Sequence, residues 1–430
     1  MKDRIRNIFD VRKGEMPVAA LLFSFFFLVI AVFQMLRPLK KGLFVEYYGA
    51  HVELYAKLGN IVVAALAVMV FTFLFNRVSR RRLIYLLSVF FICCFVWLSF
   101  ALSSAGALSI WGFYWIGDLV TTLMMVLFWA YATELATPEQ AKRLFGFIGG
   151  GGIVGGFAGS YLTKILLHYM NTSSILLLAA GLMAVLLCVT YFIEKLITGK
   201  GAFRRTMQSA PDATKEPEKG SKMTAAVEGA QLVMRSKYLI SIVGIMAFYE
   251  MASQIMDFQF SSMAEGLSGV AGTQAFLAQV SVYANGLAIV VQFFLVSLIM
   301  RKLGLVVALL VLPAAVFFSS ATFIAVSTLG IASLLSISDN GLNYSIQQTA
   351  RESLYVVTSP DEKYKARAFT NMFVQRLAKG LSILMVMGLG ILQIRISMLG
   401  LITIIVVVFM AAFSIFAGRE FSRRSERSSS

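Results

Sequence analysis

The sequence has little of what metal sites, disulfide frameworks and most catalytic centres require. It contains 2 His and 3 Cys in 430 residues, so neither a metal site nor a disulfide framework is expected. The cysteines, Cys93, Cys94 and Cys188, lie within apolar runs, where we expect them to be packing residues. We expect no catalytic residue and no cofactor, and an enzyme is the weakest of the functional classes that we considered.

Charge is scarce as well. Charged residues make up 14% of the chain and hydrophobic residues 58%, whereas a soluble domain is about 45–50% apolar. A large soluble core is therefore excluded, and the composition predicts a membrane protein with many spans. The net charge of +16 would favour nucleic-acid binding in a soluble protein. Because most of the basic residues fall in short loops, we expect the lipid bilayer as a partner and no nucleic acid.

The long apolar runs predict an all-α membrane protein. A membrane-spanning helix needs about 20 apolar residues, and nothing in the chain resembles the alternation of a β-barrel. We predict about twelve spans, near residues 16–42, 53–75, 83–103, 107–135, 144–168, 172–195, 237–262, 273–300, 303–327, 329–357, 367–393 and 397–418.

Lys and Arg are distributed unevenly between the loops. They gather at both termini and in the loops after the second, fourth, eighth and tenth spans, whereas alternate loops such as SSAGALS and AVSTLG have none. By the positive-inside rule, both termini are expected to be cytoplasmic.

One long polar segment, residues 198–227, divides the chain. It is rich in Lys, Glu, Pro, Gly and Ser, which favours a flexible cytoplasmic linker between six-helix halves at residues 1–197 and 228–430. The halves echo each other: NRVSRRRLIYLL is similar to MRKLGLVVALL, and ATPEQAKRLFGF to TSPDEKYKARAFTN. This six-plus-six pattern resembles the major facilitator superfamily, which implies a substrate site near the bilayer midplane, lined by helices one, four, seven and ten.

Charged residues lie inside these apolar runs, where each costs at least about 2.5–3.5 kcal/mol on insertion scales and often marks a site. Basic side chains in a low-dielectric cavity bind phosphate or carboxylate, although basic residues at helix ends can instead reach the membrane interface. The acids are expected to pair with the basic residues in the empty cavity, and proton carriage by one of them is the alternative. The basic set is Arg37, Lys40, Lys41, Arg351, Arg376 and Lys379. The acids are Asp118, Asp257, Asp339 and Glu352, with Glu134 and Glu250 as weaker candidates.

The fifth span contains GFIGGGGIVGGFAGS. No Gly-Lys-Ser/Thr follows, so this is not a phosphate-binding loop. Small residues at helical spacing allow close helix contact, and we expect a packing surface here.

Four segments resemble the ATP/ADP translocase family of plastids and obligate intracellular bacteria: RPLKKGL, VLFWAYATELATPEQAKRLFG, IMDFQF and RESLYVVTSPDEKYKARAFTNMFVQRLAK. The resemblance implies that Lys40 takes the place of an essential family lysine. It implies that Arg351 and Glu352 stand for a Lys-Glu pair, and that Arg376 and Lys379 match an Arg-Leu-x-Lys motif. Asp118 and Asp257 stand where Glu is usual, which keeps the charge and changes the reach.

The resemblance implies an alternating-access secondary transporter of an anionic phosphorylated solute, with ATP/ADP-type nucleotide exchange as the favoured reaction. The alternative is a proton-coupled facilitator of another anion, a lipid or a drug-like amphiphile. We expect a monomer in a bacterial inner membrane. The expected substrate-binding residues are Arg37, Lys40, Asp118, Asp257, Arg351, Glu352, Arg376 and Lys379.

Overall fold

The computed structural model describes residues 15–102, 106–199, 222–267 and 269–429, and every regular element within these ranges is a helix. The first half contains α2 (Met16–Arg77), α3 (Arg80–Ala101), α4 (Ala107–Leu135), α5 (Pro138–Leu166) and α6 (Thr172–Gly199). The rest contains α8 (Lys222–Arg235), α9 (Lys237–Ala264), α10 (Gly269–Val290), η2 (Val291–Leu295), α11 (Val296–Lys302), α12 (Gly304–Ala325), α13 (Leu329–Leu342), η3 (Asn343–Gln347), α14 (Gln348–Leu354), η4 (Tyr355–Val357), α15 (Pro360–Phe369), η5 (Thr370–Val374), α16 (Gln375–Ile391), η6 (Ile396–Met398) and α17 (Leu399–Ser429).

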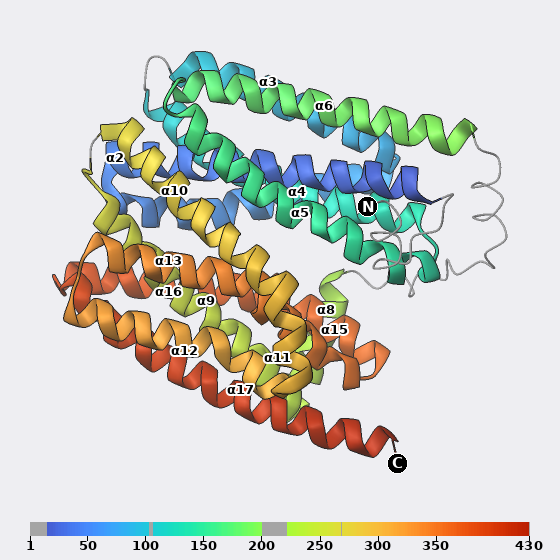
Figure 1. Cartoon of the computed structure of the whole chain (residues 1–430), viewed down its shortest axis with the longest axis vertical. Coiled ribbons are helices and arrows are strands. Elements are labelled where there is room, and N and C mark those ends of the chain that lie inside the picture. Colours follow the sequence, from blue (N-terminus) through green and yellow to red (C-terminus); the bar gives the residue numbers. More distant parts are fainter. Residues whose placement is uncertain (1–14, 103–105, 200–221, 268, 430) are drawn as a thin grey trace. The chain divides into compact units, whose positions relative to one another are not determined.

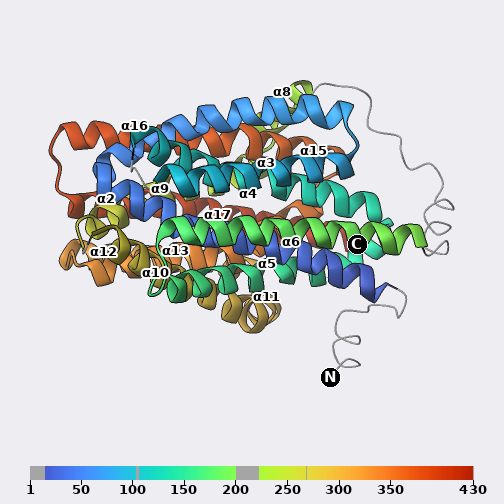
Figure 2. The same ribbon diagram turned by 90° about the horizontal axis from the view of Figure 1, so that it is seen from above.

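Helix α2 holds the first two predicted spans. It has 62 residues, which would be about 93 Å of straight helix, roughly three times the hydrocarbon thickness of a bilayer. At Gly49 the backbone leaves the helical region, with φ 81° and ψ 163°, and the chain turns back on itself (Figure 2). Glycine has no Cβ to penalise a positive φ, so the turn can be this tight.

Three of the later spans are interrupted by a π-helical turn. η2 joins α10 to α11, η3 joins α13 to α14, and η5 joins α15 to α16. Within the described residues, nine helices are long and apolar enough to cross a membrane. Counting the two arms of α2 separately, and adding the more polar helices α13–α14 and α15–α16, gives the predicted twelve.

The chain forms two compact units. The first contains residues 1–47, 62–215 and 267–282, and the second contains residues 48–61, 216–266 and 283–430. In the first unit α3 packs along α6, and in the second α17 packs along both α9 and α12 (Figure 1). The division into halves at residues 1–197 and 228–430 stays a prediction, and most of the predicted linker, residues 200–221, lies outside the described residues.

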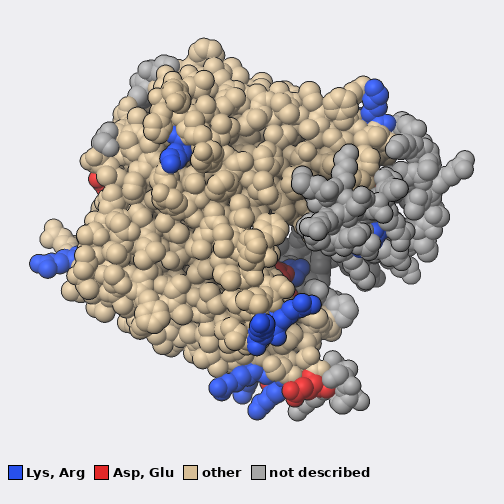
Figure 3. Space-filling view, viewed as in Figure 1, with Lys and Arg blue, Asp and Glu red and all other residues tan. Residues whose placement is uncertain are grey.

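The outer surface carries many large apolar side chains, as a protein surrounded by lipid requires. Leu108 is 79% exposed and Phe294 71% exposed, and neutral residues dominate the face in Figure 3. The expectation that all three cysteines are packing residues was wrong, because Cys93 and Cys188 are exposed. Hydropathy alone does not distinguish a lipid-facing position from a packed one on the same helix.

Candidate functional site

In the first unit, a lysine on α2 forms an ion pair with an aspartate on α4. Lys40 is 5% exposed, and its Nζ forms a short ion pair with Oδ1 of Asp118. The same Nζ donates to the carbonyl oxygen of Tyr114 at 3.4 Å and lies 4.7 Å from the centroid of the Tyr114 ring. The acids were expected to pair with members of the basic set, and Asp118 does so with Lys40. Arg37, half-buried, precedes Lys40 by three residues, so the two share a face of α2.

A glycine on α4 makes room for this lysine. A Cβ at Gly117 would lie 2.9 Å from Cδ of Lys40, which is closer than carbon atoms approach in real contacts. The aliphatic part of Lys40 therefore crosses α4 at a position without a side chain, and its ammonium group reaches Asp118.

The second unit contains a lysine that sequence reasoning missed. Lys57 Nζ lies 2.5 Å from Oδ2 of Asp257 and 3.7 Å from Oε2 of Glu53. Glu53 is 1% exposed and accepts a hydrogen bond from Ser261 Oγ at 2.8 Å. Asp257 was expected to pair with one of the basic residues named from sequence, and its partner is instead Lys57. The available signal was Glu53 followed by Lys57 four residues later, which is the favourable helical spacing.

Three predicted basic residues of the second unit lack an acidic partner. Arg351, Arg376 and Lys379 are half-buried, and no carboxylate within the described chain lies at ion-pair distance from any of them. Arg351 Nη1 contacts Sδ of Met246 at 2.9 Å. The nearby acid is Glu250, which is 7% exposed and accepts a hydrogen bond from Gln375 Nε2 at 2.7 Å, with Lys379 and Arg351 as the cations that act on it.

Glu352 pairs outside the predicted basic set. Its carboxylate forms a short ion pair with Arg367 of α15, and both side chains are more than a third exposed. The Arg367 guanidinium carbon also lies 5.2 Å from the ring centroid of Tyr355. Glu352 therefore links α14 to α15 at the edge of the unit, and Arg351 beside it keeps its charge available.

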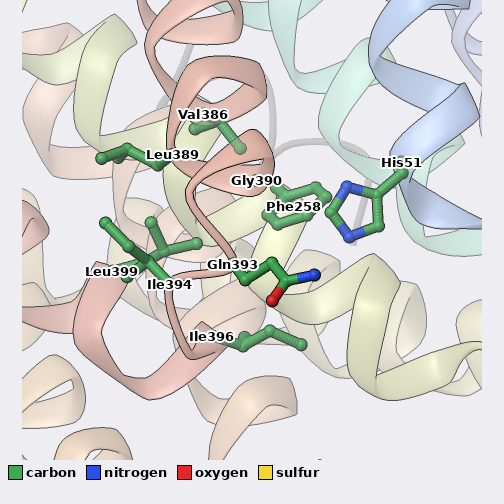
Figure 4. A pocket seen from close by; sticks show the side chains of 9 residues that line it. All are labelled: His51, Phe258, Val386, Leu389, Gly390, Gln393, Ile394, Ile396 and Leu399. Atoms are coloured by element: carbon green, nitrogen blue, oxygen red, sulfur yellow. The ribbon is translucent and has the colours of Figure 1, made fainter.

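The second unit also has an apolar cavity of about 230 Å³ (Figure 4). The His51 ring meets the Phe258 ring edge-on, with 5.1 Å between centroids, and Gln393 supplies an amide. Gly390 allows this approach, because a Cβ there would lie 3.2 Å from the imidazole of His51. No Lys or Arg lines the cavity, so it does not suit a polyphosphate.

The glycines of α5 pack against the first arm of α2, as the sequence predicted. Cβ atoms at Gly151, Gly155 and Gly159 would lie 2.3–2.5 Å from backbone oxygens of α2. These α2 oxygens belong to Phe23, Phe27 and Ala31, so both helices contribute at a spacing of four residues. The close contact holds the α2 arm that carries Lys40 against its own unit.

Comparison with known proteins gives one consistent result. The model of the TLC ATP/ADP transporter family matches residues 2–108 and 104–340. ADP,ATP carrier protein 5 of Rickettsia prowazekii (strain Madrid E) is 23% identical over 85% of this chain and 84% of its own length. ADP,ATP carrier protein 1 of Rickettsia bellii (strain RML369-C) is 20% identical over 85% and 84%.

Solved transporters share the fold. The nucleoside transporter NupG is similar with a TM-score of 0.58 and 13% identity over 95% of this chain and 98% of its own. The POT family transporter PepTSo is similar with a TM-score of 0.60 and 13% identity over 97% and 98%. The fold is thus that of major-facilitator-like transporters. Since the family model covers most of its length, the chain belongs to the TLC ATP/ADP transporter family.

Proposed function

We propose that this integral membrane transporter exchanges ATP-type and ADP-type nucleotides by alternating access. The observation that carries the proposal is the set of half-buried cations Arg351, Arg376 and Lys379, which have no carboxylate partner among the described residues. Glu250 is the acid on which Lys379 and Arg351 act, so the positive charge here exceeds the negative charge. Excess positive charge in a region of low dielectric is costly unless an anion binds. A di- or triphosphate supplies several negative oxygens at once. The names of the relatives, ADP,ATP carriers, favour a nucleotide over other phosphorylated solutes.

Lys40 and Asp118 are proposed to exchange partners during transport. In the structure, Asp118 forms an ion pair with Lys40. A bound phosphate competes for the same ammonium group, and each ion pair at 4 Å is worth about 4 kcal/mol at an effective dielectric constant of 20. Because one pair replaces another, Lys40 has an anionic partner both with and without substrate. Arg37, on the same face, is proposed to add a bidentate contact to phosphate.

Asp257 and Glu352 are proposed to support the site through their ion pairs. Asp257 holds Lys57 beside Glu53, and Glu352 holds Arg367, so neither acid neutralises the free cations. For the molecule as a whole, we propose a monomer in a bacterial inner membrane with both termini cytoplasmic. The uneven distribution of Lys and Arg between alternate loops supports this orientation.

The test is exchange by the purified full-length protein in liposomes. Labelled ATP should enter saturably when the liposomes contain ADP and only slowly when they are empty. Lys40→Ala should abolish most of this uptake. Lys302→Ala, at an exposed lysine at the end of α11, is the matched control and should leave it unchanged. Absence of saturable binding and uptake of ATP and ADP by the native protein would overturn the nucleotide assignment.

A further inference from the structure

The inference concerns an aspartate in the last turn of α13, shortly before the span continues through η3 into α14. Asp339 is ten residues after Leu329, where α13 begins, which is about 15 Å along the helix axis and half of a bilayer core of about 30 Å. It is 5% exposed. An acid at this depth that faces the protein interior is costly, and such acids are typical of ion pathways and proton relays.

The neighbours of this carboxylate are hydroxyl groups and acids. Ser253 Oγ donates to Asp339 Oδ2 at 2.7 Å, and the Tyr249 hydroxyl interacts with the same carboxyl group. The charged groups that act on it are Asp257 and Glu250. The other oxygen, Oδ1, is buried and has no hydrogen-bond partner within the described residues.

The helices packed against α13 supply little positive charge. α12 contains no ionisable residue, and the one basic residue of α9 is Lys237, its first residue. Residues 283–290 of α10, where Leu287 contacts Gly341, contribute only the exposed Tyr283. The span that carries Asp339 runs through α13, η3 and α14. On it, Tyr344 is exposed, and Arg351 lies about three helical turns after Asp339. Asp339 thus differs from Asp118 and Asp257, which each have a lysine.

Side-chain amides continue along the helix from Asp339. Asn343 and Gln347 follow at intervals of four residues within the π-helical turn η3, so the three share one face of the helix. Asn343 Oδ1 and both amide atoms of Gln347 lack partners within the described residues, and Gln347 is fully buried. π-helical turns are frequent at functional sites. These amides give a polar route from the carboxyl group along an otherwise apolar span.

We propose that Asp339 takes up and releases a proton during the transport cycle, so that nucleotide movement responds to a pH gradient. A buried carboxylate without a cation is neutralised by a proton rather than left charged. Ser253 and Tyr249 can donate to the ionised carboxylate and accept from the carboxylic acid, so both states keep partners. The inference rests on the proposed nucleotide exchange for its transport readout. Asp118 and Asp257, each neutralised by a lysine, are poorer proton carriers.

The transport test uses liposomes that contain the full-length protein. ATP uptake by the native protein should change severalfold when a pH gradient is imposed, and a pH dye inside the liposomes should report proton movement with the nucleotide. Asp339→Asn should keep ATP/ADP exchange at equal pH and lose the response to the gradient. Asp339→Glu is the matched control and should retain it. An insensitive native protein, an unaltered response in Asp339→Asn, or a response to a Na⁺ gradient instead would overturn the proposal.

A second measurement needs no substrate, so it separates this inference from the nucleotide assignment. Infrared difference spectra of the native protein should show a protonated-carboxyl band on acidification. Asp339→Asn should lack this band, and Ser253→Ala, which removes one hydrogen bond, should move the pH at which it develops. If every carboxyl band persists in Asp339→Asn and none moves in Ser253→Ala, Asp339 does not titrate and the proposal fails, whatever the substrate is.

Discussion

The position of Lys40 depends on the residue that its side chain crosses. Gly117 leaves room for Cδ of Lys40, and the lysine then reaches Asp118. In Gly117→Ala the added methyl group should push the lysine away from Asp118 without removing either charge. The lysine is flexible, so we expect folding to survive and ATP exchange to fall about tenfold, equivalent to about 1.4 kcal/mol.

The matched control for this substitution is Gly112→Ala on the same helix, where a Cβ meets no atom within 4 Å. Both changes alter helix propensity by the same amount. Exchange rates of the two variants in liposomes therefore isolate the position of Lys40. Equal rates would mean that its contact with Asp118 does not matter for transport.

Lys57 is a buried lysine whose two ion pairs should matter for the stability of the second unit. It neutralises Glu53 and Asp257 together, and Lys57→Met would leave two acids with no cation between them. Removal of one member of a buried ion pair costs roughly 3–5 kcal/mol. We expect a clear fall in the melting temperature of the detergent-solubilised protein, partly restored by adding Asp257→Asn. Lys302→Met, at an exposed site, should melt as the native protein does, and an equally stable Lys57→Met would contradict this account.

At the scale of helices, the glycines of α5 pack directly against the backbone of the first arm of α2. Gly155 faces the backbone oxygen of Phe27, so any larger residue must separate the two helices. Overpacking of this kind costs about 1–3 kcal/mol. We expect Gly155→Val to lower the melting temperature by several degrees and to reduce exchange, because the α2 arm carries Lys40.

Gly149→Val is the control for the α5 contact. A Cβ at Gly149 meets nothing within 4 Å, and the substitution carries the same change in helix propensity. If both valine variants melt at the same temperature, helix propensity and not packing decides the stability of α5.

The helices themselves could be predicted from sequence, but the interruptions within them could not. Runs of about 20 apolar residues suffice to place the twelve spans. The turn at Gly49 falls in the gap between the first two predicted spans. The π-helical turns at Asn343 and Thr370 have no hydropathy signature, since they rearrange backbone hydrogen bonds within apolar or mixed sequence. The ion pair between Lys57 and Asp257 was also missed. It joins residues 200 positions apart, and residues 48–61 belong to the second unit although the rest of the first two spans does not.

For the whole molecule, the distribution of basic residues predicts the direction in which the chain crosses the membrane. α12 has 22 residues, about 33 Å of helix, enough to cross the hydrocarbon core of about 30 Å. Arg301 and Lys302 precede it, and the segment that follows, Val326–Thr328, is exposed and uncharged. The two ends of α12 should therefore lie on opposite sides, with the basic end in the cytoplasm.

Single cysteines at these two ends test the orientation, in a background in which Cys93, Cys94 and Cys188 are replaced by Ser. A membrane-impermeant thiol reagent added to intact cells whose outer membrane has been permeabilised should label Thr328→Cys. Lys302→Cys should react only after the inner membrane is disrupted. Since the helices on either side are joined by short connections, the result at α12 fixes the direction of its neighbouring spans as well. Labelling of Lys302→Cys from outside would reverse the orientation and place the basic loops in the periplasm.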